Sequence, residues 1–150
     1  MNHNFMGPYN TLLNYLFPFE EDFVVVPQFK RPEQSKFTTI FIISRDGHPV
    51  LFVEVETIRS FSTHFNSDIQ MHETFKVLFD DVRVPKLYGI SAMGTRICVY
   101  TMDRNNGEIL PEAIPHSPTR VTDTASAERW RYDIVQPGVE DVVRGIVDES

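Results

Sequence analysis

The stretch "PVLFVEVE", residues 49–56, places two acidic residues inside what otherwise looks like a buried strand. Side chains alternate between the two faces of a strand, so Glu54 and Glu56 share one face and Val55 points to the other. A buried carboxylate is costly unless it is paired, bound to a metal or close to water. The two acids on one face therefore need a partner or a function.

The same stretch forms the second half of a predicted hairpin. Residues 37–44, "FTTIFIIS", are almost entirely β-branched or aromatic, which is typical of a strand. The "RDGH" that follows contains an Asp-Gly pair, a strong signal for a hairpin turn. An earlier strand is predicted over residues 22–29, "DFVVVPQF". Pro27 marks a strand end or a sheet edge there, because proline cannot donate a backbone hydrogen bond.

Two helices are predicted around these strands. Residues 8–17 have apolar side chains at helical spacing, and Pro18 should end that helix. Residues 67–82 begin with a capping-box pattern, Ser67 with Gln70 three residues later. An apolar stripe follows, formed by Met71, Phe75, Leu78 and Val82. The polar stretch 57–66 is predicted to be a surface loop.

The C-terminal part predicts a second hairpin and a final helix. Residues 86–91 and 96–101 are predicted strands around "AMGT", "DRNNGE" is a turn, and "ILPEAI" is a short strand. Residues 115–126 are a predicted loop, and "AERWRYDIV" fits either a helical turn or a strand. After Pro137 a helix is expected, with its inward side formed by Val139, Val142, Val143 and Ile146. The order of elements predicts an α/β (α+β) fold with a mixed central sheet flanked by helices.

Composition narrows the class of protein. A chain of 150 residues, 41% of them hydrophobic, is expected to form a single domain over residues 1–150. Cys98 is the only cysteine, which excludes an internal disulfide and an all-cysteine zinc site. The net charge of −7 disfavours tight binding to nucleic acid. With neither a secretory signal nor a long apolar run, we expect an intracellular protein, cytoplasmic or nuclear, without a membrane partner.

The order helix, three strands, helix, two strands resembles that of the PD-(D/E)XK nuclease superfamily, the restriction-endonuclease-like fold. In that superfamily the second strand begins with an aspartate, and the third carries an acid, one further residue and a lysine. Glu54 falls on the acid of this motif and Glu56 falls on the lysine. The chain also resembles a group of short, uncharacterised basidiomycete proteins over most of residues 12–135. The stretches that carry that likeness are "LFPFEEDFVVVPQFKRPE", "FTTIFII", "HPVLFVEVE", "GISAMGTRICVY", "ILPEAIPHSPT" and "RWRYDI".

The resemblance implies a particular chemistry at these positions. In the superfamily, oxygen ligands hold Mg²⁺, which polarises the phosphate and activates a water molecule. Glu54 and Glu56 are then candidate metal ligands, and Gln70 is a candidate for a helix glutamine near the site. The second strand begins with Lys36 instead of an aspartate, at "KFT". Lys36 is therefore a candidate partner that forms a salt bridge to one of the two acids in place of the metal.

Two functions follow from this resemblance, and a third follows from the predicted sheet. The leading one is a nuclease-like domain that is catalytically degenerate and binds nucleic acid or protein. The alternative is an active Mg²⁺-dependent nuclease with a migrated motif, in which Glu54 stays a ligand and the second comes from Glu56 or from an acid within residues 20–22. The third is a homodimeric scaffold that pairs through a sheet edge. The residues alone leave open whether the chain is an enzyme.

Each candidate residue also has a purely structural interpretation. Glu54 would be a carboxylate near the sheet end, solvated or capped by a helix, and Glu56 an ordinary exposed acid at a strand end. Gln70 is already explained by the capping box. His72 would be a solvated histidine on the polar side of its helix. Cys98 lies between apolar neighbours, which predicts a buried structural thiol.

Overall fold

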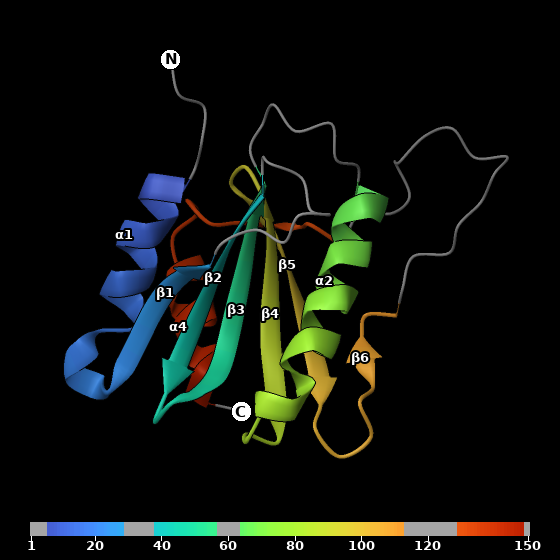
Figure 1. Cartoon of the computed structure of the whole chain (residues 1–150). Coiled ribbons are helices and arrows are strands. Elements are labelled where there is room, and N and C mark those ends of the chain that lie inside the picture. Colours follow the sequence, from blue (N-terminus) through green and yellow to red (C-terminus); the bar gives the residue numbers. More distant parts are fainter. Residues whose placement is uncertain (1–5, 29–37, 57–63, 113–128, 149–150) are drawn as a thin grey trace, which may run out of the picture.

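The computed structural model describes residues 6–28, 38–56, 64–112 and 129–148. These ranges form one mixed β-sheet with helices on both faces (Figure 1), which confirms the predicted α+β class. Short 3-10 turns follow two of the helices, at Phe19–Glu21 and Phe79–Asp81. The other elements are, in chain order, α1 (Met6–Leu16), β1 (Phe23–Gln28), β2 (Thr38–Arg45), β3 (His48–Glu56), α2 (His64–Leu78), β4 (Lys86–Met93), β5 (Arg96–Asp103), β6 (Ile109–Leu110), β7 (Tyr132–Asp133) and α4 (Val139–Asp148).

The sheet has the strand order β1-β2-β3-β4-β5-β6, and β7 pairs with β5 as well. β1, β2 and β3 form an antiparallel meander. β4 runs parallel to β3, because α2 carries the chain back across the sheet between them. β5 then returns antiparallel to β4. The predicted order of helix, three strands, helix and two strands is therefore confirmed.

The turn between β2 and β3, followed by a one-residue register shift between Ile43 and Ser44, sets the register of the strand that carries the two acids. Asp46 and Gly47 both have positive φ, 55° and 83°, as a two-residue turn matching the strand twist requires. The pairing that follows places Ile40 opposite Glu54 and Thr38 opposite Glu56. The start of β2 therefore lies beside the end of β3.

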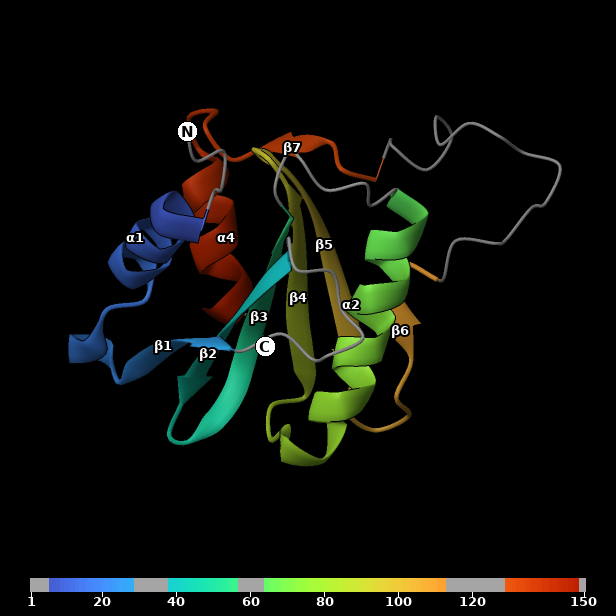
Figure 2. The same ribbon diagram turned by 45° about the horizontal axis from the view of Figure 1, so that its top comes forward.

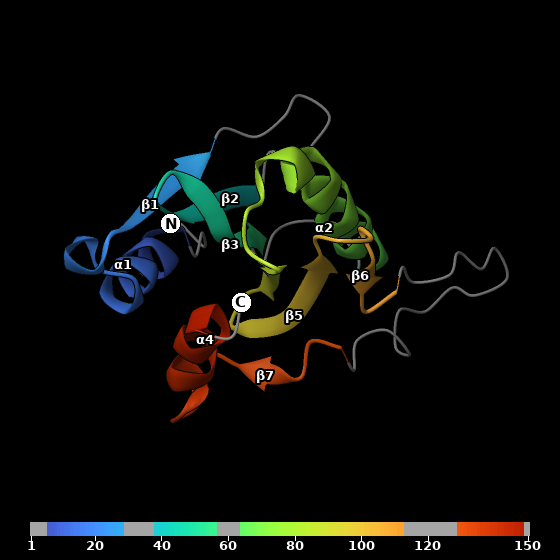
Figure 3. The ribbon, with the colours of Figure 1, turned by 90° about the horizontal axis from the view of Figure 1, so that it is seen from below.

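The alternation along β3 divides the core into two layers. Seen from below, α1 and α4 lie on one side of the sheet and α2 lies on the other (Figure 3). Leu51, Val53 and Val55 pack toward α1 and α4. Phe52 packs toward α2, in a cluster with Met71, Phe75, Leu87, Tyr100 and Trp130. Because Glu54 and Glu56 alternate in step with Phe52, they lie on the α2 side of the sheet.

The α2 layer is closely packed around Gly89 of β4. Gly89 is the register partner of Phe52, whose ring meets that of Phe75 edge-on with centroids 4.7 Å apart. A Cβ atom added at Gly89 would lie 2.7 Å from the Phe52 ring and 2.9 Å from the Met71 methyl group. The absence of a side chain at this position gives the aromatic pair its space.

The first turn of α2 differs from the prediction. The helix begins at His64, so Ser67 and Gln70 lie inside it and the predicted capping box is wrong. The pattern matches locally, but the helix extends one turn further upstream than the pattern indicates. Residues 64–66, predicted as loop, are helical, whereas 57–63 lie outside the described residues. At its other end the α-helix stops at Leu78 and continues as a 3-10 turn.

The C-terminal segment also differs at single positions. Val142 was expected to face inward with its neighbours, but it is 47% exposed. α4 instead faces the sheet with Val139, Val143, Ile146 and Val147, one side of a regular helix. Within "AERWRYDIV", Tyr132 and Asp133 form β7, which resolves the two alternatives in favour of a strand.

The β1 edge of the sheet and the character of the helices bear on possible partners. β1 forms one edge of the sheet and exposes Val24 and Val26. This exposed edge is compatible with pairing to a second copy, which stays a prediction. Pro27 within β1 works against such pairing, because proline removes one backbone N–H donor from the edge. None of the described helices is both long and apolar enough to cross a membrane.

We expect Gly89→Ala to destabilise the protein by about 1–3 kcal/mol, because the fully buried Phe52 and Met71 leave no room for a methyl group. Urea unfolding measures this change. The matched control is Gly145→Ala in α4, where nothing lies within 4 Å of an added Cβ. That variant should gain about 0.5–1 kcal/mol, since alanine favours a helix over glycine. Equal effects of the two substitutions would contradict the packing described around Phe52.

Candidate functional site

Glu54 lies in the middle of the interface between the sheet and α2. Its register partners are Ile40 on β2 and Ser91 on β4. Only 2% of Glu54 is exposed, and the Thr74 hydroxyl of α2 donates a hydrogen bond to its Oε2. Thr74 reaches it because it belongs to the buried side of α2, together with Met71 and Phe75. Glu54 is therefore neither solvated nor capped by a helix N-terminus, the two structural alternatives, because a hydroxyl from within α2 donates to it.

Glu56 is also buried, although it ends β3. It is 2% exposed, so its predicted position as an exposed strand-end acid is wrong. The reason is the direction of α2, which runs back from the end of β3 toward the start of β4 (Figure 1). The first turns of α2, including the buried Ser67 and Asp68, therefore stand at the same end of the sheet as Glu56.

The other two predicted site residues are Gln70, which lies on α2, and Lys36, which precedes β2. Gln70 lies one turn before Thr74 on α2 and is half-buried, so it shares the helix side that faces the acids. Lys36 lies outside the described residues, and its salt bridge to Glu54 or Glu56 stays a prediction.

Asp68 is the centre of a polar cluster that the sequence did not indicate. It is fully buried, and the Tyr100 hydroxyl of β5 donates to its Oδ1 at 2.7 Å. Nη1 of Arg129 lies 3.3 Å from the same oxygen, and Nε2 of His72 lies 3.7 Å away. Asp68 therefore ties α2 to β5 and to the segment before β7. Tyr100 and Arg129 are 32 and 61 residues away in the chain, so no local pattern points to them.

His72 belongs to this cluster, and its prediction as a solvated surface residue is wrong. Its ring meets that of Tyr100 edge-on, with centroids 5.9 Å apart. Within the described residues, its buried Nε2 atom has no hydrogen-bond partner. The side of α2 that looks polar in the sequence carries Asp68 and His72 one turn apart, and β5 covers it.

A third polar contact lies between the other two. Nε1 of Trp130 donates to Oγ of Ser91 at 3.2 Å. Ser91 pairs with Glu54 on one side and with Cys98 on the other. Polar side chains of β3, β4 and β5 therefore stand beside those that α2 contributes to the same interface. We call this group the α2 seam; it consists of Glu54, Glu56, Asp68, Thr74, Ser91 and Tyr100.

Burial sets the protonation of the groups at the β5 end of the α2 seam. It raises the pKa of the Tyr100 hydroxyl well above its ordinary value, and the hydrogen bond to Asp68 adds to the effect. Burial also raises the pKa of the Cys98 thiol to about 12, although the nearby Arg129 charge partly opposes it. Cys98 is a buried, protonated thiol, as the sequence predicted.

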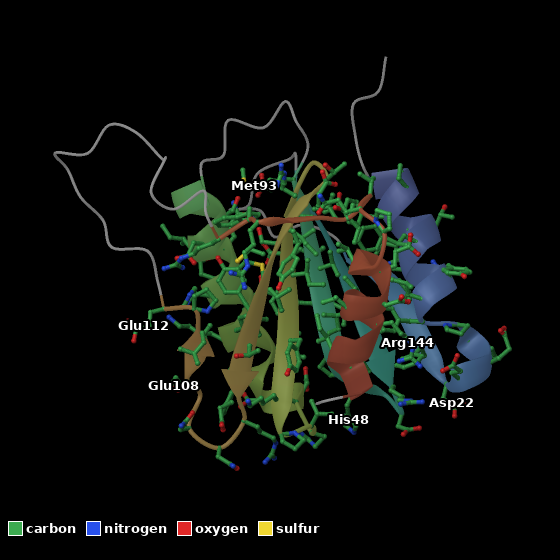
Figure 4. The ribbon with its side chains drawn as sticks, turned by 180° about the vertical axis from the view of Figure 1, so that it is seen from behind. Asp22, His48, Met93, Glu108, Glu112 and Arg144 are labelled. Atoms are coloured by element: carbon green, nitrogen blue, oxygen red, sulfur yellow. The ribbon has the colours of Figure 1, made fainter. Side chains whose placement is uncertain are left out.

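The acids at residues 20–22 do not join the α2 seam. They precede β1, whose first residue Phe23 pairs with Arg45 beside the β2–β3 turn. From behind, Asp22 and His48 lie at one end of the sheet, whereas Met93, the register partner of Glu56, lies at the other (Figure 4). Oε1 of Glu21 accepts a hydrogen bond from Arg144 of α4 at 2.6 Å. Asp22 therefore lies at the end of the sheet away from Glu56 (Figure 4), and a migrated metal site that combines an acid of residues 20–22 with Glu54 stays a prediction.

Comparisons with known proteins add no further evidence. No protein-family model, no curated protein and no solved structure matches the chain.

Across the described ranges, no three or more His, Cys, Asp or Glu side chains gather in a way that could hold a metal ion. The interpretation of the α2 seam therefore rests on the chemistry of its own residues.

We expect Thr74→Val to lower the free energy of unfolding by about 1–3 kcal/mol, because it removes a hydroxyl donor from the buried Glu54 carboxylate without changing the volume. Thr74→Ser keeps the hydroxyl and loses one methyl group, so it should cost at most about 1 kcal/mol. Urea unfolding of the two variants distinguishes these effects. A valine variant as stable as the parent would show that Glu54 does not depend on Thr74.

We also expect stability to fall in alkaline solution. The Cys98 thiol ionises near its ordinary value of 9.0 when unfolded, but keeps its proton to about 12 when folded. Ionisation then favours the unfolded chain above pH 9, by about 1.4 kcal/mol at pH 10. Urea unfolding at pH 8 and pH 10 measures the loss. Between pH 8 and pH 10 the Cys98→Ala variant should lose about 1.4 kcal/mol less stability than the parent. An identical loss in both proteins would show that the Cys98 thiol does not have the raised pKa.

Proposed function

We propose that the chain is a nuclease-like domain of the PD-(D/E)XK type that no longer cuts and serves as a binding module for a protein partner. The observation that carries the proposal is the burial of Glu54 and its hydrogen bond to Thr74. This residue falls on the acid of the motif, yet it is 2% exposed and accepts a hydrogen bond from Thr74. A carboxylate that is buried and hydrogen-bonded in this way is engaged between α2 and the sheet and is closed to a substrate.

The topology supports the likeness to the superfamily. The elements α1, β1, β2, β3, α2, β4 and β5 follow one another in the order that the resemblance implies. The start of β2 lies opposite Glu56 at the end of β3, through the pair Thr38 and Glu56. An aspartate opening the second strand would therefore stand near the motif acid. This chain has Lys36 and Phe37 just before Thr38 instead.

The residues of the α2 seam do not fit a catalytic Mg²⁺ ion. Mg²⁺ gives up its water reluctantly and usually keeps several waters beside one or two carboxylates. Glu54 and Glu56 are each 2% exposed, and one oxygen of Glu54 already accepts the Thr74 hydroxyl. In addition, Glu56 places an acidic residue where the motif carries a lysine. These residues therefore support no catalytic step through a metal.

Charge favours a protein over a nucleic acid as the partner. The chain has a net charge of −7, and association with a phosphate backbone depends on cationic side chains that release counterions. A second copy of the chain is one such protein partner, since β1 is an edge strand with two exposed valines, Val24 and Val26.

A cleavage assay tests the proposal against the active alternative. The protein is incubated with single- and double-stranded DNA and with RNA, in Mg²⁺ or Mn²⁺, beside Glu54→Gln and a buffer control. We expect no cleavage above the buffer control from either protein. Cleavage by the parent that is lost in Glu54→Gln, with both proteins folded by circular dichroism, would overturn the proposal. Cleavage of equal rate in both that stays with the protein through repurification would also overturn the proposal, because the chain would then cut without Glu54.

A further inference from the structure

Among the described residues, the outer edge of β5 has strand partners at its two ends and none in between. β6 pairs with Thr101 and Met102, and β7 pairs with Arg96 and Ile97. The two short strands therefore lie at different ends of β5, as Figure 2 shows. In the described part of the chain, Cys98, Val99 and Tyr100 have no strand partner on this edge.

A surface hollow of about 640 Å³ opens at this gap. That volume is within the usual range for sites that bind small molecules, roughly 300–1,000 Å³. Its wall is mostly apolar and comes from β5, from the residue after β6, from β7 and from α4: Val99, Pro111, Tyr132, Val142 and Ile146. Val142, the α4 residue expected in the core, is 47% exposed on this wall. Its outward position gives the hollow an apolar side.

The charged groups of the hollow are both cationic. Arg129 and Arg131 line it, and no carboxylate does so among the described residues, although the whole chain has a net charge of −7. Nη1 of Arg129 is already engaged, since it donates to the Glu112 carbonyl at 2.8 Å and lies 3.3 Å from Asp68. Its charge is therefore largely balanced within the protein.

Arg131 is the cation that a ligand can use. It is exposed, and its guanidinium lies 5.3 Å from the centroid of the Tyr132 ring. Within the ranges that the structure describes, no carboxylate lies at ion-pair distance from Arg131. An arginine fork beside an apolar wall matches a carboxylate that is joined to an apolar group.

We propose that the hollow at the β5 edge binds a small organic carboxylate with an apolar body. The carboxylate pairs with Arg131, and the body packs on Val99, Val142 and Ile146. A free carboxylic acid and the C-terminal carboxylate of a short peptide share this chemistry. The site lies apart from Glu54 and Glu56 and is independent of the nuclease-like proposal.

Titrations followed by ¹H–¹⁵N correlation spectra test the proposal on the full chain. The probes are 4-phenylbutyrate and its uncharged amide, with acetyl-leucyl-phenylalanine as the peptide arm. We expect saturable shifts of the Val99, Tyr132 and Val142 amide signals with at least one carboxylate, and much smaller shifts with the amide. The arm that binds more tightly identifies the source of the carboxylate.

Two charge variants show whether Arg131 is responsible. Arg131→Gln should weaken carboxylate binding about threefold or more, because it removes the pairing cation. Lys76→Gln removes an exposed charge from α2, outside the hollow, and should leave the affinity unchanged. No saturable shift with either carboxylate, equal binding of the uncharged amide, or equal binding by the two variants would each overturn the proposal.

Discussion

The hydrogen bond from Thr74 to Glu54 is the contact around which the rest of this structure is arranged. It joins the second half of α2 to the last residues of β3, where the neighbouring contacts are apolar, such as that between Phe52 and Phe75. A carboxylate in such an interface is tolerated only if donors reach it, so α2 must present Thr74 at that position and not elsewhere. The bond from Tyr100 to Asp68 fixes the same helix a turn and a half earlier, against β5. Together the two bonds hold α2 against both β3 and β5.

That constraint also shapes what the α2 seam can do. A catalytic carboxylate that binds a metal needs access to water and to that metal. Glu54 is only 2% exposed, and one of its oxygens already accepts a hydrogen bond from Thr74. The second acid lies two residues on, at Glu56, and is equally buried. The seam therefore resembles the interior of a domain more than the open centre of an enzyme, and the exposed features of the molecule lie elsewhere. They include the valines of β1 and the cationic hollow at the β5 edge.

Much of the fold could be predicted because its signals are local. The Asp46-Gly47 turn, the alternation along β3 and the apolar residues Met71, Phe75 and Leu78 each act within a few positions of the chain. The short strand β7 is different, since it exists only through its pairing with β5, and the local pattern there fits a helical turn as well as a strand. The start of α2 was missed because a pattern typical of a helix cap, Ser67 to Gln70, occurs within the helix.

The candidate site was predicted less completely, for the same physical reason. The pairing of Glu54 and Glu56 on one face follows from strand geometry alone. Their burial does not, because it depends on the direction in which α2 crosses the sheet. The cluster of Asp68, Tyr100 and Arg129 joins three distant segments, and only the packed structure brings them together.

The most direct test of this account is the dependence of folding stability on a divalent cation. An ion that binds only the folded chain raises its free energy of unfolding, by about 2.7 kcal/mol at a concentration 100 times the dissociation constant. The measurement is urea unfolding in Mn²⁺ and in EDTA, for the parent and for Glu54→Gln. If Glu54 is a structural acceptor for Thr74, Mn²⁺ should change the stability of the two proteins equally or not at all. A stabilisation of the parent by Mn²⁺ that disappears in Glu54→Gln would contradict the account and identify Glu54 as a metal ligand.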